Sequence, residues 1–234
     1  MTRMSFAEEL RKEVDSIIRT RWVTRKGYVV PDAEDVQLGN DAVKLQGTVL
    51  YADLAESSGL VKNHSETFAA EIYKSFLVSA CRIIRQNDGE ITAFDGDRVM
   101  AVFIGDSPNT DAAKTGLQIK WAAENIISPK IREVYKDVDY KVRHAVGIDT
   151  CELFVARTGI RGSNDLVWVG AAANFAAKLS ALREEGFATY LTDEVFSRLR
   201  ESAKVGGNPK RSMWEQRAFG GRSIHRSNWW WSLD

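Results

Sequence analysis

The chain has 234 residues, of which 44% are hydrophobic, so it can bury the core of one sizeable α/β domain. Lysine plus arginine equals aspartate plus glutamate at 32 each, so the basic excess typical of nucleic-acid-binding proteins is missing. Two cysteines are too few for a disulfide-stapled secreted domain, and no apolar run approaches the roughly 20 residues that span a bilayer. These observations predict a cytoplasmic protein with no nucleic-acid partner and no direct membrane contact.

The N-terminal segment predicts an amphipathic helix over residues 4–21, because apolar residues recur there at helical spacing. The stretch from Trp22 to Pro31 predicts a connector of short extended character, bounded by glycine and proline. We therefore expect residues 1–40 to form an N-terminal helix and connector. Residues 41–234 should form one continuous domain, since no linker or repeat interrupts them.

Periodicity and turn signals divide this domain into alternating strands and helices. In chain order they predict a strand at 46–54, a turn at 57–59, a helix at 65–86, strands at 90–94 and 99–104, a helix at 109–134, strands at 140–148, 152–156 and 165–169, a helix at 171–183, a strand at 189–191, a helix at 194–200 and strands at about 213–219 and 223–231. This order is typical of an α+β fold with a ferredoxin-like βαββαβ core and additional C-terminal strands and helix. The glycine-rich fingerprints of dinucleotide and P-loop phosphate sites are absent from the sequence.

Two aspartates stand where predicted apolar strands end. Asp53 closes the first strand, and Asp97 lies in the tight turn between the next two. If these strands are neighbours, as the ferredoxin-like order implies, both carboxylates reach the same end of the sheet. Two close carboxylates repel, which makes Mg²⁺ or Mn²⁺ a natural partner together with substrate phosphates. Each aspartate alone is more commonly a turn or cap residue, but the pair favours a metal site.

The small residues that follow Asp53 offer a place for phosphate. Ser57 and Ser58 lie in a segment that could turn its backbone N–H groups towards phosphate oxygens. We therefore predict that these two serines contact a phosphorylated ligand.

Three blocks of sequence, in this order and spacing, resemble the catalytic domain of class III adenylyl and guanylyl cyclases over residues 45–231. The blocks are Val49–Leu54, Phe94–Phe103 and Val169–Leu179, the last preceded by Val146–Ile148. The resemblance implies that residues 41–234 are a nucleotidyl cyclase catalytic domain. It also implies that Asp53, Asp97 and the Leu54 carbonyl bind two Mn²⁺ or Mg²⁺ ions per site.

The third block supplies the catalytic residues that the resemblance implies. Asn174 matches the asparagine that orients the ribose, and Lys178 stands where the family usually has a transition-state arginine. Four residues apart, the two share one helix face. In the family they come from the partner subunit, which implies a homodimer with composite active sites. A solvated lysine is the ordinary alternative for Lys178, but asparagine is a poor residue inside a helix, which favours a ligand or interface contact for Asn174.

Two more residues are assigned to the nucleotide. Arg222 could hold the distal phosphates, although an arginine beside two glycines is more often only solvated. Tyr51 could stack on a small base, and ordinary core packing explains it equally well.

The residues that read a purine base in adenylyl cyclases are missing. The position of their lysine is Ala93 and the second base-reading position falls near Val167, and neither side chain can form a hydrogen bond with a base. The closer resemblance is to the pyrimidine cyclases of bacterial antiphage signalling, through the Trp22–Pro31 segment, Leu38–Asn40 and the strand that ends at Asp53. It implies UTP or CTP as substrate, with UTP favoured.

This resemblance also implies a cyclic pyrimidine product, cUMP or cCMP, that acts as a messenger in antiphage defence and is read by a separate effector. A purine cyclase using ATP or GTP is one alternative. A catalytically inactive domain that senses nucleotides is another. Retention of Asp53, Asp97 and Asn174 argues against the inactive domain, whereas lysine in place of arginine at position 178 leaves it open.

Overall fold

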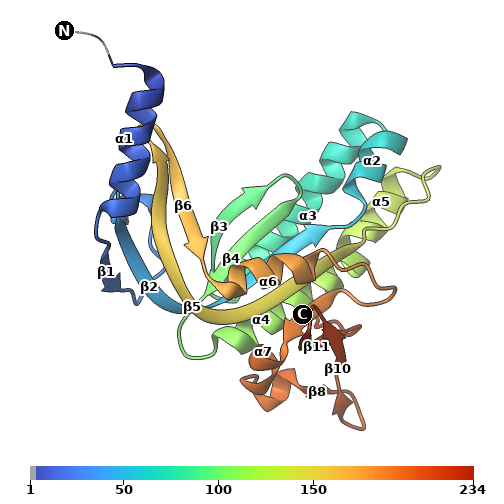
Figure 1. Ribbon diagram of the computed structural model, residues 1–234. Helices are drawn as coiled ribbons and strands as arrows, with labels where there is room; N and C mark the ends of the chain where they lie inside the picture. The colour runs from blue at the N-terminus through green and yellow to red at the C-terminus, as the bar shows by residue number, and fades with distance from the viewer. Residues whose placement is uncertain (1–3) are drawn as a thin grey trace. The chain divides into compact units, whose positions relative to one another are not determined.

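The computed structural model describes residues 4–234 (Figure 1). The chain divides into two compact units, one comprising Met1–Leu45 and Glu152–Gly170 and the other Gln46–Cys151 and Ala171–Asp234. The division is discontinuous in sequence because strands β2 and β5 each run from one unit into the other. The boundary expected near residue 40 stays a prediction. Within residues 4–234, none of the helices combines the length and apolarity needed to cross a bilayer.

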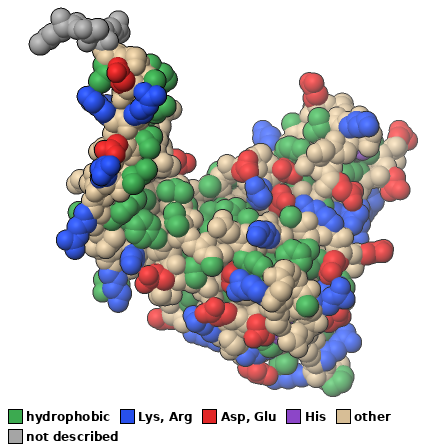
Figure 2. Space-filling model, viewed as in Figure 1, with side chains coloured by type: hydrophobic (Ala, Val, Ile, Leu, Met, Phe, Trp, Pro, Cys, Tyr) green, Lys and Arg blue, Asp and Glu red, His purple; other side chains and the backbone are tan. Residues whose placement is uncertain are grey.

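The first unit contains the predicted N-terminal helix. Its elements are α1 (Phe6–Arg19), β1 (Val23–Lys26), a 3-10 turn (Ala33–Asp35), the start of β2 (Asp41–Leu54), the end of β5 (His144–Ile160) and β6 (Ser163–Val169). Strand β1 pairs in parallel with β2, and β6 pairs in antiparallel with β5. A capping box of Ser5 and Glu8 starts α1, and the amide of Asn40 donates to two carbonyls at its end. Hydrophobic side chains of α1 are exposed along the helix (Figure 2).

The second unit contains the sheet that carries the candidate site. Its further strands are β3 (Gly89–Asp95), β4 (Arg98–Phe103), β7 (Thr189–Thr192), β10 (Glu215–Phe219) and β11 (Arg222–Ser227), with a separate pair β8 (Val205–Gly206) and β9 (Arg211–Ser212). The strand order is β10-β11-β7-β5-β2-β4-β3. The four consecutive strands β5-β2-β4-β3 are the fourth, first, third and second strands of the predicted βαββαβ unit. This order confirms the ferredoxin-like core.

Helices cover this sheet. They are α2 (Ser57–Asn63), α3 (Glu66–Gln86), α4 (Pro108–Ala122), a π-helical turn η2 (Ala123–Ile127), α5 (Ser128–Val134), α6 (Ala171–Ser180), α7 (Asp193–Ser197) and a 3-10 turn (Glu201–Ala203). Ser65 caps α3 by accepting a hydrogen bond from the Phe68 backbone, as the sequence predicts. The predicted helix 109–134 instead contains a π-helical turn. Pro129 explains it, because proline has no N–H and its ring would clash with the carbonyl four residues earlier.

Two apolar clusters lie on opposite faces of the sheet. One joins α3 and α4 to even-numbered residues of β2 such as Leu50 and Ala52. The other contains Leu179 of α6 together with Ala145 of β5 and Tyr190 of β7. Because successive side chains of a strand alternate between faces, the odd-numbered residues of β2 face away from the first cluster, towards the side that α6 covers.

Two predictions about strands are wrong. The strands expected at 140–148 and 152–156 form the single strand β5, because the polar residues between them are satisfied inside the sheet: the Thr150 hydroxyl donates to the Gly47 carbonyl at 3.1 Å. The last strand, β11, ends at Ser227 and not near residue 231. Beyond it, Trp229 and Trp231 pack against the main core and the Trp231 N–H donates to the Leu117 carbonyl.

Candidate active site

The hairpin between β3 and β4 brings Asp97 to the end of β2 that carries Asp53. In the antiparallel register Asp53 lies opposite Arg98, the residue directly after Asp97. Gly96 takes a left-handed backbone conformation with a φ of 62°, which a side chain would oppose, so the turn can be tight. The two aspartates predicted as metal ligands therefore lie at the same edge of the sheet.

The Asp53 carboxylate is largely buried and forms an ion pair with Arg183. Its side chain is 15% exposed, and its Oδ2 accepts a hydrogen bond from Nη2 of Arg183 at 3.0 Å. Burial raises the pKa of Asp53; Arg183 opposes this rise, and the nearby charge of Asp97 adds to it. The environment of Asp53 thus disfavours its ionised form unless further positive charge arrives.

Asp97 has an unsatisfied oxygen. Its Oδ2 is buried and has no hydrogen-bond partner within residues 4–234. A buried carboxylate oxygen without a donor is costly, and a divalent cation would satisfy it. No cluster of three or more histidine, cysteine or acidic side chains suited to a metal occurs in the described part of the chain. Two carboxylates with substrate phosphates are the ligand set that Mg²⁺ uses, so Asp53 and Asp97 fit such an ion.

The segment after Asp53 is a helix and not the predicted turn. Leu54 is buried, the Ala55 N–H donates to the Arg143 carbonyl at 2.8 Å, and Glu56 takes a left-handed conformation with a φ of 60°. Helix α2 then begins at Ser57, because Leu60 one turn later is buried in the core and holds the segment down. The first N–H groups of a helix have no acceptor within it, and the side chain of Glu56 does not cap them. The phosphate contacts of Ser57 and Ser58 stay a prediction.

Helix α6 presents Asn174 and Lys178 on its exposed face. The opposite face, with Ala176 and Leu179, is buried against the sheet. Gly147 of β5 allows this close packing, since a Cβ at that position would lie 2.1 Å from the Ala176 carbonyl oxygen. The side chains of Asn174 and Lys178 form no hydrogen bond or ion pair with the described residues, so both are available to a substrate or a second subunit.

Arg222 is held by its own chain. Its Nη1 donates to Oδ2 of Asp149 at 3.1 Å, and its guanidinium lies 4.3 Å from the ring centroid of Phe175 on α6. Asp149 is only 1% exposed and also accepts a hydrogen bond from the Thr192 hydroxyl at 2.6 Å. Asp149 is not among the residues predicted from the sequence, although an aspartate after the apolar Val146–Ile148 run could have suggested a buried acceptor. The role of Arg222 with distal phosphates stays a prediction.

Tyr51 and the two base-reading positions lie on three strands. Tyr51 of β2 is half-buried, its ring lies 5.5 Å from the Arg98 guanidinium, and burial raises the pKa of its hydroxyl. Ala93 is on β3 and pairs with Met100 of β4, whereas Val167 is on β6. The proposed stacking of Tyr51 on a base stays a prediction.

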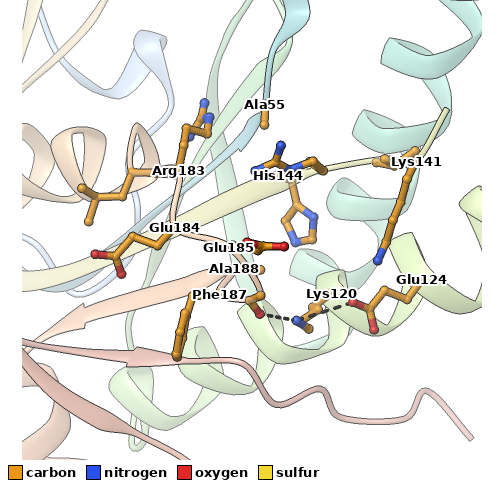
Figure 3. A pocket seen from close by; sticks show the side chains of 14 residues that line it. Ala55, Lys120, Glu124, Lys141, His144, Arg183, Glu184, Glu185, Phe187 and Ala188 are labelled. Carbon is orange, nitrogen blue, oxygen red and sulfur yellow. Dashed lines mark hydrogen bonds and ion pairs between the residues drawn. The ribbon is translucent and has the colours of Figure 1, made fainter.

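A cavity of about 510 Å³ is lined by Ala55 and by Arg183, the residue that is hydrogen-bonded to Asp53 (Figure 3). Charged side chains of both signs line it: the basic Lys120, Lys141, Arg143 and Arg183 and the acidic Glu124, Glu184 and Glu185. Among them stands His144, whose pKa burial lowers to about 3, with the charges of Lys120 and Arg183 acting in the same direction. His144 is therefore neutral at pH 7 and adds no charge to the wall of the cavity.

Arg183 is the residue of this region that the sequence does not reveal. It follows α6 in an exposed, charged run, where an arginine is ordinarily solvated. No local signal links it to Asp53, which is 130 residues away in the chain. The fold alone places the two side chains together.

Curated proteins include relatives that match this chain over nearly its whole length. The chain is 46% identical to a uridylate cyclase of Xanthomonas perforans, covering 99% of this chain and 100% of the relative. It is 42% identical to a uridylate cyclase of Burkholderia cepacia, covering 98% of this chain and 100% of the relative. No protein-family model matches the chain.

Solved structures of low sequence identity share the fold. A guanylyl cyclase crystal structure superposes with a TM-score of 0.65 at 15% identity, covering 79% of this chain and 92% of that one. The adenylyl cyclase CyaB from P. aeruginosa gives a TM-score of 0.63 at 18% identity, covering 80% and 95%. The sheet, its helices and their order are thus those of cyclase catalytic domains.

Proposed function

We propose that this chain, which belongs to the uridylate cyclase family of nucleotidyl cyclases, converts UTP to 3′,5′-cyclic UMP and pyrophosphate with divalent metal ions. The observation that supports this most is the paired carboxylate site: Asp53 is largely buried and Asp97 has an orphaned oxygen at the same sheet edge. We infer UTP as the substrate because the full-length relatives are named uridylate cyclases.

The metal ions would be held by Asp53, Asp97 and the Leu54 carbonyl. Bound Mn²⁺ or Mg²⁺, two per site, would lower the pKa of the ribose 3′-hydroxyl and neutralise the triphosphate. Around them, Ser57 and Ser58 would donate backbone N–H groups of the first turn of α2 to phosphate oxygens. Arg222, if it leaves Asp149, would take the distal phosphates.

The residues of α6 would act on the reacting atoms. Asn174 would hold the ribose so that its 3′-oxygen lies in line with the α-phosphorus. A bond forms between these two atoms as the bond from the α-phosphorus to the pyrophosphate oxygen breaks, and pyrophosphate leaves. Lys178 would offset the negative charge that grows on the α-phosphoryl oxygens.

The exposure of the α6 face supports a homodimer with composite sites. Asn174 and Lys178 have no side-chain hydrogen bond or ion pair within residues 4–234, whereas Asp53 already has Arg183. A second subunit that presents its α6 to the carboxylates would complete each site, so that one dimer carries two. The dimeric arrangement is part of the proposal.

The absence of purine-reading side chains supports a pyrimidine substrate. Ala93 and Val167 offer no hydrogen-bonding group, so a site built on them cannot select a purine by its polar edge. We favour UTP over CTP as the substrate because the relatives are named uridylate cyclases. Tyr51 would stack on the base. A cyclic pyrimidine messenger for antiphage defence, a separate effector that reads it and a cytoplasmic location complete the proposal.

Incubation of the purified protein with Mn²⁺ and each of the four nucleoside triphosphates tests this function. The expected result is cyclic UMP from UTP, identified by mass spectrometry, with far less product from CTP, ATP and GTP. An Asp97→Ala sample is the control for contaminating cyclases. Cyclic AMP or cyclic GMP as the main product would contradict the pyrimidine assignment, and no cyclic product from any triphosphate would favour an inactive nucleotide-sensing domain.

A further inference from the structure

Arg183 is anchored at the end of α6 and reaches the candidate metal ligand. Its Nη1 donates to the carbonyls of Ser180 at 2.6 Å and Leu182 at 2.9 Å, and its Nη2 donates to Asp53 at 3.0 Å. One guanidinium therefore links the carbonyls that follow α6 to the carboxylate at the end of β2.

The position of Arg183 is that of a counter-ion. The paired side chains are 30% exposed for Arg183 and 15% for Asp53, so solvent screens their attraction only in part. The other arginine near these carboxylates is Arg98, whose Nη2 donates a hydrogen bond to the exposed Asp95 at 2.6 Å. The guanidinium of Arg183 is the cation hydrogen-bonded to Asp53, and the charge of Arg98 also acts on that carboxylate. Among the described residues, none provides a hydrogen-bond partner for Oδ2 of Asp97.

We propose that Arg183 is an internal counter-ion that holds Asp53 in the metal-free protein and that a divalent ion must displace it. This inference rests on the proposed function, since it concerns the same carboxylates. The guanidinium and a metal ion compete for the lone pairs of Asp53, and they repel each other at the short separation that one carboxylate imposes. Arg183 thereby sets the affinity of the metal-free protein for its cation.

A displaced Arg183 side chain has space to move into. Arg183 lines the cavity of about 510 Å³, where Figure 3 shows it beside Ala55 and above Glu184. Because the guanidinium is a rigid plane, withdrawal of Nη2 from Asp53 requires the whole group to pivot about the bonds that Nη1 makes to the carbonyls of Ser180 and Leu182. Displacement therefore needs no rearrangement of the sheet.

The test is the affinity for Mn²⁺ without nucleotide, measured by electron paramagnetic resonance of free Mn²⁺. Arg183→Gln removes the competing charge, and we expect it to bind Mn²⁺ about fivefold more tightly than the wild type, as for a pair worth about 1 kcal/mol. Arg143→Gln is the matched control. It also lines the cavity, but its guanidinium pairs with Glu56 at 2.8 Å and not with Asp53, so its Mn²⁺ affinity should equal that of the wild type.

The outcomes separate this inference from the proposed function. A folded Arg183→Gln variant with unchanged or weaker Mn²⁺ affinity would overturn the counter-ion role alone. A wild-type protein that binds no Mn²⁺, or an Asp97→Ala variant that binds it equally well, would overturn the proposed metal site itself.

If Arg183→Gln does not fold, the wild type provides a second readout. Nitrogen-15 NMR of the arginine side chains follows the Arg183 Nε–H signal, assigned by its loss in Arg183→Lys, while Mg²⁺ is added. Displacement predicts a shifted resonance and faster hydrogen exchange at saturating Mg²⁺. A signal that stays unchanged through saturation would overturn the inference.

Discussion

The two halves of the candidate site are built in opposite ways. The carboxylate edge with Asp53 and Asp97 is largely buried, charged and partly neutralised from within by Arg183. The α6 face with Asn174 and Lys178 is exposed and has no side-chain partner in the described chain. A buried negative charge must find positive charge inside its own fold, whereas water satisfies an exposed amide or ammonium group.

The difference indicates which component each half of the site lacks. The carboxylate edge lacks only cationic charge, which a metal ion can bring. The α6 face lacks a partner surface, which a second subunit with its bound nucleotide can bring. Each of the following predictions removes one half or tests how the two halves combine.

Removal of a metal ligand should have the largest effect. Asp97→Ala should lower the rate of cyclic UMP formation by about 10³-fold or more, because metal binding contributes several kcal/mol to transition-state stabilisation. Chromatographic product assay at saturating Mn²⁺ measures it. Asp95→Ala is the control, since Asp95 lies in the same hairpin but is 78% exposed and pairs with Arg98. An Asp97→Ala variant within tenfold of the wild type would show that the carboxylate edge is not a metal site.

Removal of the positive charge on α6 should have the next effect. Lys178→Ala should lower kcat by about 10²–10³-fold, the usual loss for one donor to developing negative charge, with little change in KM. Lys178→Arg should restore most of the rate because the charge is kept. Equal activity of the alanine variant and the wild type would leave Lys178 as a solvated side chain.

Mixing the two inactive proteins tests whether the halves come from different subunits. Asp97→Ala and Lys178→Ala together should recover about one quarter of wild-type activity after full exchange, because half of the dimers are mixed and each has one intact site. Native mass spectrometry of differently tagged chains verifies the exchange. Mixed dimers without activity would place both halves of each site in one chain.

The smallest effect concerns stability at the carboxylate edge. Burial raises the pKa of Asp53, so its contribution to stability is present below the unfolded pKa and is lost as pH rises through the folded value. In metal-free protein at pH 7, Asp53→Asn should therefore raise Tm by about 1–3 °C, and the gain should vanish as pH falls towards the acid range. Calorimetry with a chelator measures both. A lower Tm for the variant at pH 7 would mean that the ion pair with Arg183 outweighs the cost of burial.

The sequence alone predicts the order of the helices and strands and the pairing of Asp53 with Asp97. Helix α3 with its Ser65 cap and the hairpin around Gly96 depend on residues near each other in the chain, so their patterns can be identified locally. The βαββαβ order then implied that Asp53 and Asp97 meet. Local patterns failed where distant groups decide the outcome, as in β5, whose polar residues are satisfied by Gly47 and Thr192 of other strands.

The pairing of charged side chains depends on the tertiary structure and could not be predicted from the sequence. Arg183 reaches Asp53 across 130 residues, and Arg222 reaches Asp149 across 73. Both contacts depend on which strands are neighbours and on where α6 rests on the sheet, and the packing of two apolar cores sets these. A charged side chain carries no signal in the sequence for the partner that a fold will give it, because its attraction acts only once the chain has brought the two groups together.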